Sequence, residues 1–410
     1  MNFEAAVKYL KSFRAYDEEL KVEYNEKNFD LVRIKDFLKA YKIDDSKVKY
    51  IHVAGSKGKG SVCSMIERYI RAKGLKTGLF LSPYMVKITE SFYLNGKEMP
   101  PKKFVSYVKD LKKFIEVQGG TSLTSFELMV VMAIKYFSDE KVDYAVIEVA
   151  MGGRLDATNV ISPKLAVLTS IELEHTDVFG KSLKRIVYEK CGIVINEVPV
   201  VVAPQNNLVR KLIKTELKGR KSKMFFTDEI SIPKINVDFE NLVHEDNAKV
   251  VYLSLKTLLN EVDMKVFKNV LSVFKFEGRF DVRKVNGKTV VFDIAHTENS
   301  MRNLVNSLAK KFPKKDFLFL FSVMIGKNVS AMLDEILKIS DEIVFTRSHK
   351  IRGYEAKELF GKYSKIFQKS SFMEDPFMAY ASLLKKVSKN RILVVTGSHF
   401  LVGKIFSKIK

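Results

Sequence analysis

The chain contains a glycine-rich stretch whose residue types could bind a phosphate group. Gly55, Gly58 and Gly60 lie close together, Lys59 precedes the third glycine and Ser61 follows it. Glycines let backbone N–H groups curl around phosphate oxygens, a lysine can bridge terminal phosphates, and a hydroxyl can ligate Mg2+. The spacing G-x-x-G-K-G-S is shorter than the common G-x-x-x-x-G-K-[ST] loop. Nucleotide phosphate binding is the preferred interpretation, and a plain glycine turn is the alternative.

Apolar residues on both sides of this stretch indicate the elements that would hold it. Ile51 to Ala54 are apolar-rich and lead directly into the first glycine. Behind the loop, apolar residues recur at helical spacing at Val62, Met65, Ile66, Tyr69 and Ile70. The expected arrangement is strand, phosphate loop and helix.

Acidic residues accompany two further apolar runs. Glu148 lies one step before the end of the run Tyr144 to Val149. A carboxylate inside an apolar strand is costly unless it is paired or bound to a metal, so we favour a Mg2+ ligand over a structural acid. Past the next apolar run come Glu172, Glu174 and His175. A lone histidine is more often structural than a ligand, and both interpretations of His175 stay open on this evidence.

Strands and helices alternate along the chain, which predicts an α/β fold. Apolar runs with no polar face are typical of a parallel sheet that is covered on both sides. We expect a P-loop-type doubly wound, mostly parallel sheet and a second, smaller Rossmann-like α/β domain. The polar stretch 283–288 contains Asn-Gly, a turn signal. It is predicted to join domains that span 1–284 and 288–410.

The periodicity of apolar residues places the individual elements. Helices are expected within 3–13, 34–41, 62–70, 104–114, 125–137 and 300–311. Strands are expected near 51–54, 77–81, 144–149, 165–170, 198–202, 290–293, 317–321, 343–345 and 391–395.

The composition fits an ordinary globular protein of 410 residues, with 46% hydrophobic and 29% charged residues. No apolar run approaches the roughly 20 residues of a membrane helix. The net charge of +22 is spread over the whole length, which favours a lysine-rich composition over attraction of a polyanion. The only cysteines are Cys63 and Cys191, so a disulfide framework is not expected and a reducing cytoplasm is the predicted compartment.

Six ordered motifs resemble those of the folylpolyglutamate synthase and dihydrofolate synthase family, within the wider ATP-dependent Mur ligase group. They stand at Gly55–Ser61 (GSKGKGS), Met151–Asn159 (MGGRLDATN), Thr169–His175 (TSIELEH), Glu189–Ile193 (EKCGI), Asp293–His296 (DIAH) and Val395–Gly403 (VTGSHFLVG). The resemblance implies an ATP-binding domain of the Mur ligase central type, with N-terminal helices, over 1–284. It implies a Rossmann-like ligase domain over 288–410.

The resemblance also implies a site for two Mg2+ ions. One ion would be held by Ser61 and Glu148, and the other by Glu148, His175 and Ser82 of a Ser-Pro loop. Such hard oxygen ligands, with some nitrogen, suit Mg2+. Lys190 corresponds to a lysine that is typically carbamylated in this family, which would make it an anionic ligand near the second ion. An unmodified helix lysine is the alternative.

The same resemblance assigns further roles. The implied ATP-binding residues are Gly55, Ser56, Lys57, Gly58, Lys59, Gly60, Ser61, Asn247, Arg279 and Asp293. The implied catalytic residues are Lys59, Lys190 and His296, with His296 facing the cleft between the domains. The implied substrate-binding residues are Ser82, Tyr84, Arg154, Asp156 and Ser398. Ser398, on the loop after the last strand, is the candidate for the incoming amino acid.

The implied reaction is ATP-dependent addition of L-glutamate to the γ-carboxylate of a folate. The carboxylate would attack the γ-phosphate of ATP to give an acyl phosphate and ADP, and the amine of glutamate would then displace phosphate. The expected partners are a reduced folate or dihydropteroate and L-glutamate. We expect a monomer that binds neither nucleic acid nor membranes.

Two residues depart from the family pattern on the acceptor side. Tyr84 stands where the family has histidine, and Ser91 stands where an arginine is usual. A serine cannot replace the bidentate carboxylate contact of an arginine, so the acceptor is less determined than the ATP chemistry. Folylpolyglutamate synthase activity is favoured, and dihydrofolate synthase activity stays open. The alternatives are a Mur-type ligase for a cell-wall precursor and a non-catalytic nucleotide- or nucleic-acid-binding protein.

Overall fold

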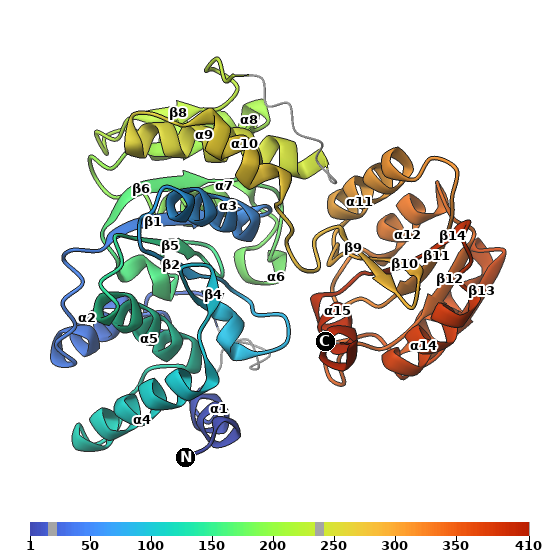
Figure 1. The fold of residues 1–410 in the computed structure, drawn as a ribbon, viewed down its shortest axis with the longest axis horizontal. Coiled ribbons are helices and arrows are strands. Elements are labelled where there is room, and N and C mark those ends of the chain that lie inside the picture. The colour runs from blue at the N-terminus through green and yellow to red at the C-terminus, as the bar shows by residue number, and fades with distance from the viewer. Residues whose placement is uncertain (15–22, 234–241, 410) are drawn as a thin grey trace. The chain divides into compact units, whose positions relative to one another are not determined.

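The computed structural model describes residues 1–14, 23–233 and 242–409. The chain divides into two compact units (Figure 1). Unit 1 comprises Met1–Val237 and Glu245–Val273, and unit 2 comprises Asp238–His244 and Phe274–Lys410. Each unit contains one sheet with helices around it, so the predicted two-part α/β fold is confirmed.

Unit 1 is built on an eight-stranded sheet. Its strands lie in the order β4 (Lys97–Glu98), β3 (Phe92–Leu94), β2 (Thr77–Phe80), β5 (Tyr144–Glu148), β1 (Lys49–Ala54), β6 (Pro163–Leu168), β7 (Val200–Val202), β8 (Met224–Phe226). In this spatial order, each strand from β2 onwards pairs in parallel with the next one, up to β8. Strand β3 pairs antiparallel with β2 and with β4. The sheet is therefore mostly parallel, as predicted.

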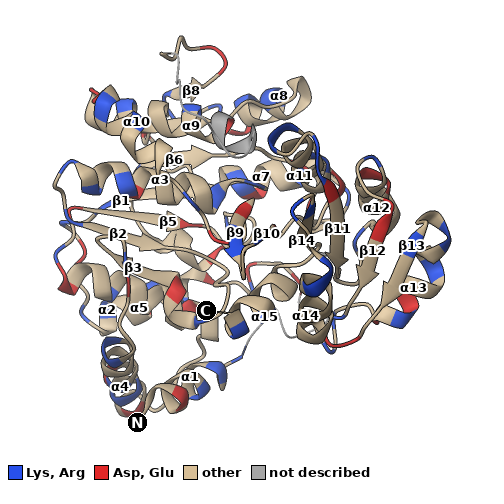
Figure 2. Cartoon of the chain, turned by 45° about the vertical axis from the view of Figure 1, so that its right-hand side comes forward, with Lys and Arg blue, Asp and Glu red and all other residues tan. Residues whose placement is uncertain are grey.

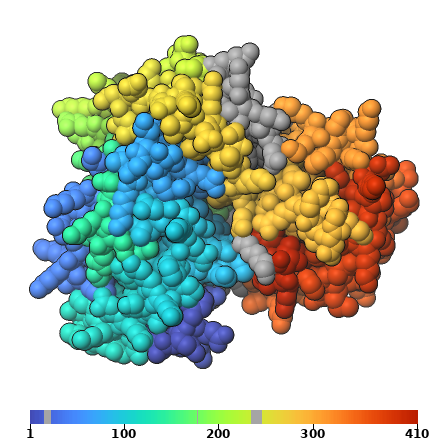
Figure 3. All heavy atoms as spheres, viewed as in Figure 1, coloured from blue at the N-terminus to red at the C-terminus, as the bar shows by residue number. Residues whose placement is uncertain are grey.

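The helices of unit 1 precede, connect and follow these strands along the chain. They are α1 (Phe3–Lys11), α2 (Leu31–Ala40), α3 (Lys59–Ala72), α4 (Pro101–Val117), α5 (Ser125–Asp139), α6 (Thr176–Phe179), α7 (Leu183–Cys191), α8 (Asn207–Glu216), α9 (Leu242–Leu259) and α10 (Met264–Ser272), with 3-10 turns η1 (Ile88–Ser91) and η2 (Ala157–Val160). The two N-terminal helices that the sequence predicts are α1 and α2. Helix α10 packs on α3, and Figure 3 shows yellow atoms of the α9–α10 region beside blue atoms of the region around α3.

Unit 2 contains a six-stranded sheet. Its order is β13 (Lys369–Phe372), β12 (Glu342–Phe345), β11 (Asp316–Phe321), β14 (Arg391–Thr396), β10 (Lys288–Phe292), β9 (Asp281–Val285). Only β9 pairs antiparallel. The helices are α11 (Glu298–Lys311), α12 (Val329–Leu337), α13 (Ala356–Tyr363), α14 (Pro376–Lys386) and α15 (His399–Ile409), with η3 at Ser364–Ile366.

The stretch 283–288, predicted to join the domains, instead forms the β9–β10 hairpin inside unit 2. Asn286 and Gly287 have φ values of 51° and 75°, as a two-residue hairpin turn requires. The units divide between Val273 and Phe274, upstream of the predicted boundary. The Asn-Gly signal was correctly interpreted as a turn, but a tight turn between paired strands stays within one compact unit.

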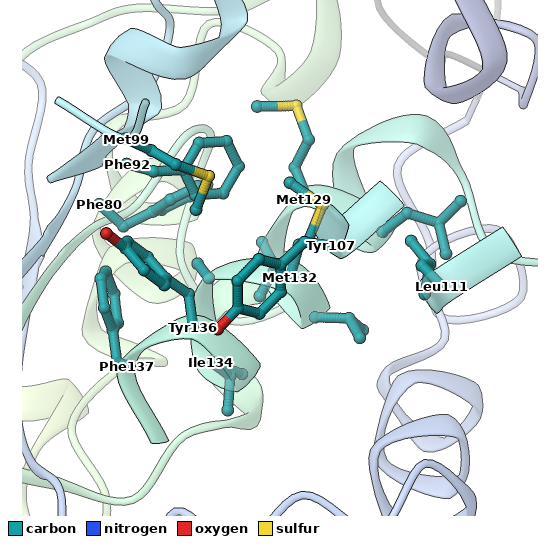
Figure 4. Close-up of a cluster of buried hydrophobic side chains, with 14 of the residues drawn as sticks. Phe80, Phe92, Met99, Tyr107, Leu111, Met129, Met132, Ile134, Tyr136 and Phe137 are labelled. Atoms are coloured by element: carbon teal, nitrogen blue, oxygen red, sulfur yellow. The ribbon is translucent and has the colours of Figure 1, made fainter. Parts of the chain in front are cut away.

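A large apolar cluster fixes α4 and α5 against the sheet of unit 1. Tyr136 and Phe137 of α5 lie in it, near Phe80 of β2 and Phe92 of β3 (Figure 4). The Phe92 ring centroid is 5.6 Å from that of Phe80. Strand β1 is buried from its second residue to its last, because it lies at the centre of the sheet with helices over it. This central position places the loop after β1 on a rigid support.

Positive charge is distributed over the helices of both units (Figure 2). A depression with a volume of about 420 Å³ and several basic lining residues lies along α8. Two of its cations, Arg210 and Lys214, are paired with Glu229, and Arg210 is also paired with Asp228. Partial neutralisation of this kind agrees with a dispersed lysine-rich composition.

Two further predictions can be compared with the described residues. None of the helices in 1–14, 23–233 and 242–409 is long and apolar enough to cross a membrane. Cys63 and Cys191 are both buried and free.

Replacement of Phe92 by alanine should destabilise unit 1 by about 3–5 kcal/mol, because its side chain is fully buried and the surrounding rings cannot close the cavity. Urea unfolding followed by circular dichroism measures this change. The matched control is Val117→Ala at the exposed end of α4, where the side chain is 75% exposed and the expected change is within about 0.5 kcal/mol. Equal effects of the two substitutions would contradict the packing described.

Candidate active site

The phosphate loop occupies residues 55–58, between the end of β1 and the start of α3. Gly55 has a φ of 147°, and a Cβ atom there would lie 1.8 Å from Thr169 Oγ1. Gly58 has a φ of 84°. Only glycine tolerates both the backbone conformation and the close approach. The predicted strand, loop and helix are therefore confirmed, and the glycines are needed because the loop runs directly over the end of β6.

The first turn of α3 consists of Lys59, Gly60 and Ser61, and Gly58 is its N-cap residue. No side chain caps this helix end. The first backbone N–H groups of a helix have no partner within the helix, and they favour an anion. A helix of 14 residues with this end after a glycine loop is suited to bind phosphate.

Two lysines converge on one backbone oxygen of the loop. Lys59 Nζ lies 3.1 Å from the Gly55 carbonyl oxygen, and Lys190 Nζ lies 2.8 Å from the same atom. Lys190 comes from α7, which is far away in the sequence. Burial lowers the pKa of Lys190, and the nearby Glu174 opposes that shift. The loop therefore carries two adjacent cations, an arrangement that stabilises added negative charge.

Glu174 is a site residue that the sequence analysis did not single out. Its carboxylate lies 2.5 Å from Lys190 Nζ. Burial alone would raise the pKa of Glu174, but Lys190 and Lys59 lower it to about 2. The sequence showed only that Glu174 is an acid next to His175. Glu174 matters because the fold brings Lys190 beside it.

Glu148 and Ser82 lie together, as the resemblance implied. Glu148 is the last residue of β5 and is buried. The backbone N–H of Ser82 donates to Glu148 Oε2 at 3.1 Å. The Ser82 hydroxyl is buried without a hydrogen-bond partner among the described residues. A carboxylate and an unpartnered hydroxyl at the end of β5 fit the oxygen ligands of Mg2+. Helix α3, which carries Ser61, packs on β5.

His175 lies at the start of α6 in a left-handed conformation, with a φ of 45°. Its Nε2 atom is 4.0 Å from Glu174 Oε2. The part of the chain that the structure describes contains no group of three or more His, Cys, Asp or Glu residues arranged to hold a metal. The proposed ligand set of Ser61, Ser82, Glu148 and His175 has only two such residues, and its hydroxyls suit a hard, partly hydrated cation.

Asn247 of α9 lies against the phosphate loop. A Cβ atom on Gly58 would lie 2.6 Å from Asn247 Oδ1. The Asn247 Nδ2 atom is buried and has no hydrogen-bond partner among the described residues. An unused amide donor beside the loop supports the predicted contact of Asn247 with a nucleotide, which stays a prediction.

Two predicted substrate residues make contacts within unit 1. Arg154 is ion-paired with Glu189 at 3.3 Å and with Glu26 at 2.7 Å. Asp156 accepts hydrogen bonds from the backbone N–H groups of Ala150, Met151 and Thr158. Through these contacts both side chains stabilise the loop after β5. Their contact with substrate stays a prediction.

The segment that departs from the family pattern is packed inward. Ser91, at the position of the usual arginine, is fully buried in η1. Glu90 accepts hydrogen bonds from the backbone N–H groups of Met85 and Val86 at 2.8 Å. Tyr84 is partly buried and packs against the cluster of Figure 4. Position 91 is therefore fully buried, and the small side chain of serine fits there.

Unit 2 contains Arg279, Asp293, His296 and Ser398. Asp293 accepts hydrogen bonds from the backbone N–H groups of Phe280 at 2.7 Å and Ala295 at 2.8 Å. Burial raises the pKa of Asp293 to about 6, against the opposing effect of Arg279. His296 Nδ1 lies 2.9 Å from the Ile294 carbonyl oxygen; this oxygen can only accept, so the proton is on Nδ1.

Ser398 is also buried, and its hydroxyl accepts a hydrogen bond from the Phe400 N–H at 3.1 Å. It follows the end of β14, as the sequence predicts. Arg279 is close enough to Asp293 to lower its pKa, and the Asp293 N–H donates to the carbonyl oxygen of Val395 in β14, the strand that Ser398 follows. The roles of all four residues in binding ATP or an amino acid stay predictions.

Family models match both units of the chain. The Mur ligase middle domain matches residues 53–295, and the Mur ligase glutamate ligase domain matches residues 278–399. The chain belongs to the Mur ligase family. The match of the middle domain includes the phosphate loop, Glu148, Glu174 and Lys190, so the residues that converge in unit 1 lie inside a Mur ligase domain.

Curated relatives of this Mur ligase chain match more than nine-tenths of its length. Dihydrofolate synthetase of Saccharomyces cerevisiae is 28% identical, over 92% of this chain and 96% of that protein. Dihydrofolate synthase/folylpolyglutamate synthase of Bacillus subtilis is 26% identical, over 93% of this chain and 95% of that protein. The resemblance inferred from the six motifs is confirmed.

Solved Mur ligase structures share the fold. Mycobacterium tuberculosis folylpolyglutamate synthase complexed with ADP superposes with a TM-score of 0.87 at 22% identity, covering 99% of this chain and 98% of that one. The bifunctional folylpolyglutamate synthase/dihydrofolate synthase from Yersinia pestis, complexed with AMPPNP and a Mn ion, superposes with a TM-score of 0.84 at 23% identity. The match covers 100% of this chain and 98% of that one.

The raised pKa of Asp293 predicts how the stability of this Mur ligase depends on pH. The folded chain binds this proton more tightly than the unfolded chain, whose carboxyl has an ordinary pKa of 3.8. The resulting stabilisation is complete below that value and is lost as the pH rises through about 6. Between pH 4.5 and 7.5, the unfolding free energy of the wild type relative to Asp293→Asn should fall by about 2 kcal/mol. Urea unfolding at several pH values measures this difference, and parallel pH profiles would contradict the assignment.

Proposed function

We propose that this Mur ligase couples ATP cleavage to the addition of L-glutamate to the γ-carboxylate of a folate. The observation that carries the proposal is the position of Lys59 and of the N-terminus of α3, which no side chain caps, at the glycine-rich loop. This arrangement favours phosphate and developing negative charge. The names of the yeast and Bacillus relatives supply the acceptor and the amino acid.

In the proposed first step, an oxygen of the folate γ-carboxylate attacks the γ-phosphorus of ATP. The bond from that phosphorus to the β,γ-bridging oxygen breaks, ADP leaves, and an acyl phosphate forms. Lys59 and the backbone N–H groups at the start of α3 stabilise the charge on the transferred phosphoryl group. Asn247 is positioned beside the loop, where its free amide N–H can donate to the nucleotide.

In the second step, the neutral amine of L-glutamate attacks the carbonyl carbon of the acyl phosphate. The bond from this carbon to the phosphate oxygen breaks, phosphate leaves, and the nitrogen loses a proton to give the amide. Ser61, Ser82, Glu148 and His175 would hold Mg2+, which offsets the negative charge of the phosphates. Asp293 and Arg279 are proposed to contact ATP, His296 to assist catalysis, and Ser398, Tyr84, Arg154 and Asp156 to contact the substrates.

A second activity, dihydrofolate synthase, is proposed for the same site. Dihydrofolate synthetase is the name of one relative that covers nearly the whole chain, and it is half of the name of the other. The two activities share the ATP chemistry and differ in the acceptor, which is dihydropteroate instead of a folate that already carries glutamate. The buried Ser91 and the partly buried Tyr84 are where this chain differs on the acceptor side.

Purified protein with Mg-ATP and labelled L-glutamate should release ADP and transfer label to tetrahydrofolate, to dihydropteroate or to both. Chromatography of the labelled products separates these outcomes. A cell-wall nucleotide-sugar precursor is the third acceptor to include. Label on this precursor alone would overturn the proposal, and so would the absence of glutamate-dependent ADP release with every acceptor.

Lys59→Ala is the control for that assay. It should abolish turnover, since it removes one of the two cations at the loop, while the melting temperature stays close to that of the wild type because the side chain is only partly buried. Lys135→Gln, on the surface of α5, should leave turnover unchanged.

We further propose that Lys190 becomes carbamylated when the cation site is filled. Its neutral amine would attack the carbon of CO2 and release one proton to solvent. The product would place a second anion beside Glu174, now 2.5 Å from Lys190 Nζ, and such a pair of anions requires a cation to offset it. With 13C-labelled bicarbonate, a carbamate carbon resonance should therefore appear on addition of Mg2+ and be absent in Lys190→Gln. No Mg2+-dependent signal in the wild type would indicate an unmodified lysine.

A further inference from the structure

Lys57 belongs to the phosphate loop, but its side chain is paired with a carboxylate of the protein. Lys57 Nζ lies 2.6 Å from Glu172 Oε2. The two side chains are 22% and 32% exposed, so the pair is half-buried at the edge of the loop. A lysine held in this way already has an anionic partner before any phosphate binds.

The residue before Lys57 is tied to the same segment. The Ser56 N–H donates to the Ser170 carbonyl oxygen at 2.7 Å. The Glu172 N–H donates to Ser56 Oγ at 3.0 Å, and Lys57 forms an antiparallel bridge with Ser170. Residues 56–57 therefore run alongside 170–172 like a short pair of strands, and the Lys57–Glu172 ion pair closes the end of that pair.

The segment 170–172 continues to Glu174, which makes the other ion pair of the loop. Glu174 binds Lys190, and Lys190 also donates to the Gly55 carbonyl oxygen. Two lysine–glutamate pairs thus hold the loop to the segment 170–175, a buried one at Gly55 and a half-buried one at Lys57. Both depend on the same short segment after β6.

We infer that Lys57 and Glu172 are positioning residues, which form a clamp that holds the phosphate loop in its binding conformation. The inference rests on the proposed function, because the ligand of the loop is taken to be ATP or ADP. A glycine-rich loop loses much conformational freedom when it binds. A contact that orders the loop beforehand reduces this loss and increases affinity. Lys57 then acts through the backbone of the loop and not as a phosphate ligand.

A direct contact between Lys57 and phosphate predicts a different effect of Glu172→Gln on ADP affinity. If Lys57 bound phosphate directly, Glu172 would compete with the nucleotide for it. Replacing Glu172 would then release Lys57 and leave ADP binding unchanged or tighter. In the clamp, loss of either partner weakens binding equally, because each is useful only through the other.

The experiment is titration calorimetry of Mg-ADP into the wild type, Lys57→Gln, Glu172→Gln and the double variant. Each single variant should bind ADP about two- to fivefold more weakly, as expected for one half-exposed ion pair. The double variant should bind no more weakly than either single variant, since the pair is already lost. Titrations are run well below the melting temperature of each variant, so that unfolding does not contribute.

Lys135→Gln is the matched control. Lys135 is also 22% exposed and ion-paired, to Asp139 at 2.9 Å within α5, and its loss should leave ADP affinity unchanged. Unchanged or tighter binding by Glu172→Gln, or losses that add in the double variant, would overturn the clamp. A wild-type protein that binds no Mg-ADP would instead count against the proposed function.

Discussion

The backbone at Gly55 is the constraint on which the nucleotide site depends. A side chain at this position would overlap Thr169, and the carbonyl oxygen of the same residue accepts from both Lys59 and Lys190. The close approach brings the end of β1 against the end of β6. The carbonyl oxygen accepts hydrogen bonds from two lysine side chains, one of α3 and one of α7. One peptide unit thus joins the strand, the helix and the charged residues of the candidate site.

Two buried or half-buried ion pairs maintain this arrangement, and their costs differ. Lys190 is 2% exposed and Glu174 is 17% exposed, so an unpaired charge on either side chain would be costly and the pair offsets that cost. Lys57 and Glu172 keep contact with solvent, so their attraction is screened and small. The buried pair fixes the charges of the site, whereas the outer pair adjusts the conformation of a loop made flexible by its glycines.

Unit 2 uses buried polar groups in a similar way at the ends of its strands. Asp293 lies directly after β10 and binds two backbone N–H groups, while Ser398 follows β14 and receives one. Carboxyl ends of parallel strands are where such folds place ligands. The ligand-binding roles of these residues stay predictions.

The sequence by itself determined the fold class, most elements and the phosphate loop, because hydrophobic periodicity and glycine spacing are local signals. It also paired Ser82 with Glu148 through the family resemblance. It did not reveal the importance of Glu174, the pairing of Lys57 with Glu172, or the boundary between Val273 and Phe274. Only the tertiary structure decided these, since each depends on which distant segments become neighbours. The sequence around a lysine does not indicate which distant carboxylate the parallel sheet will place beside it.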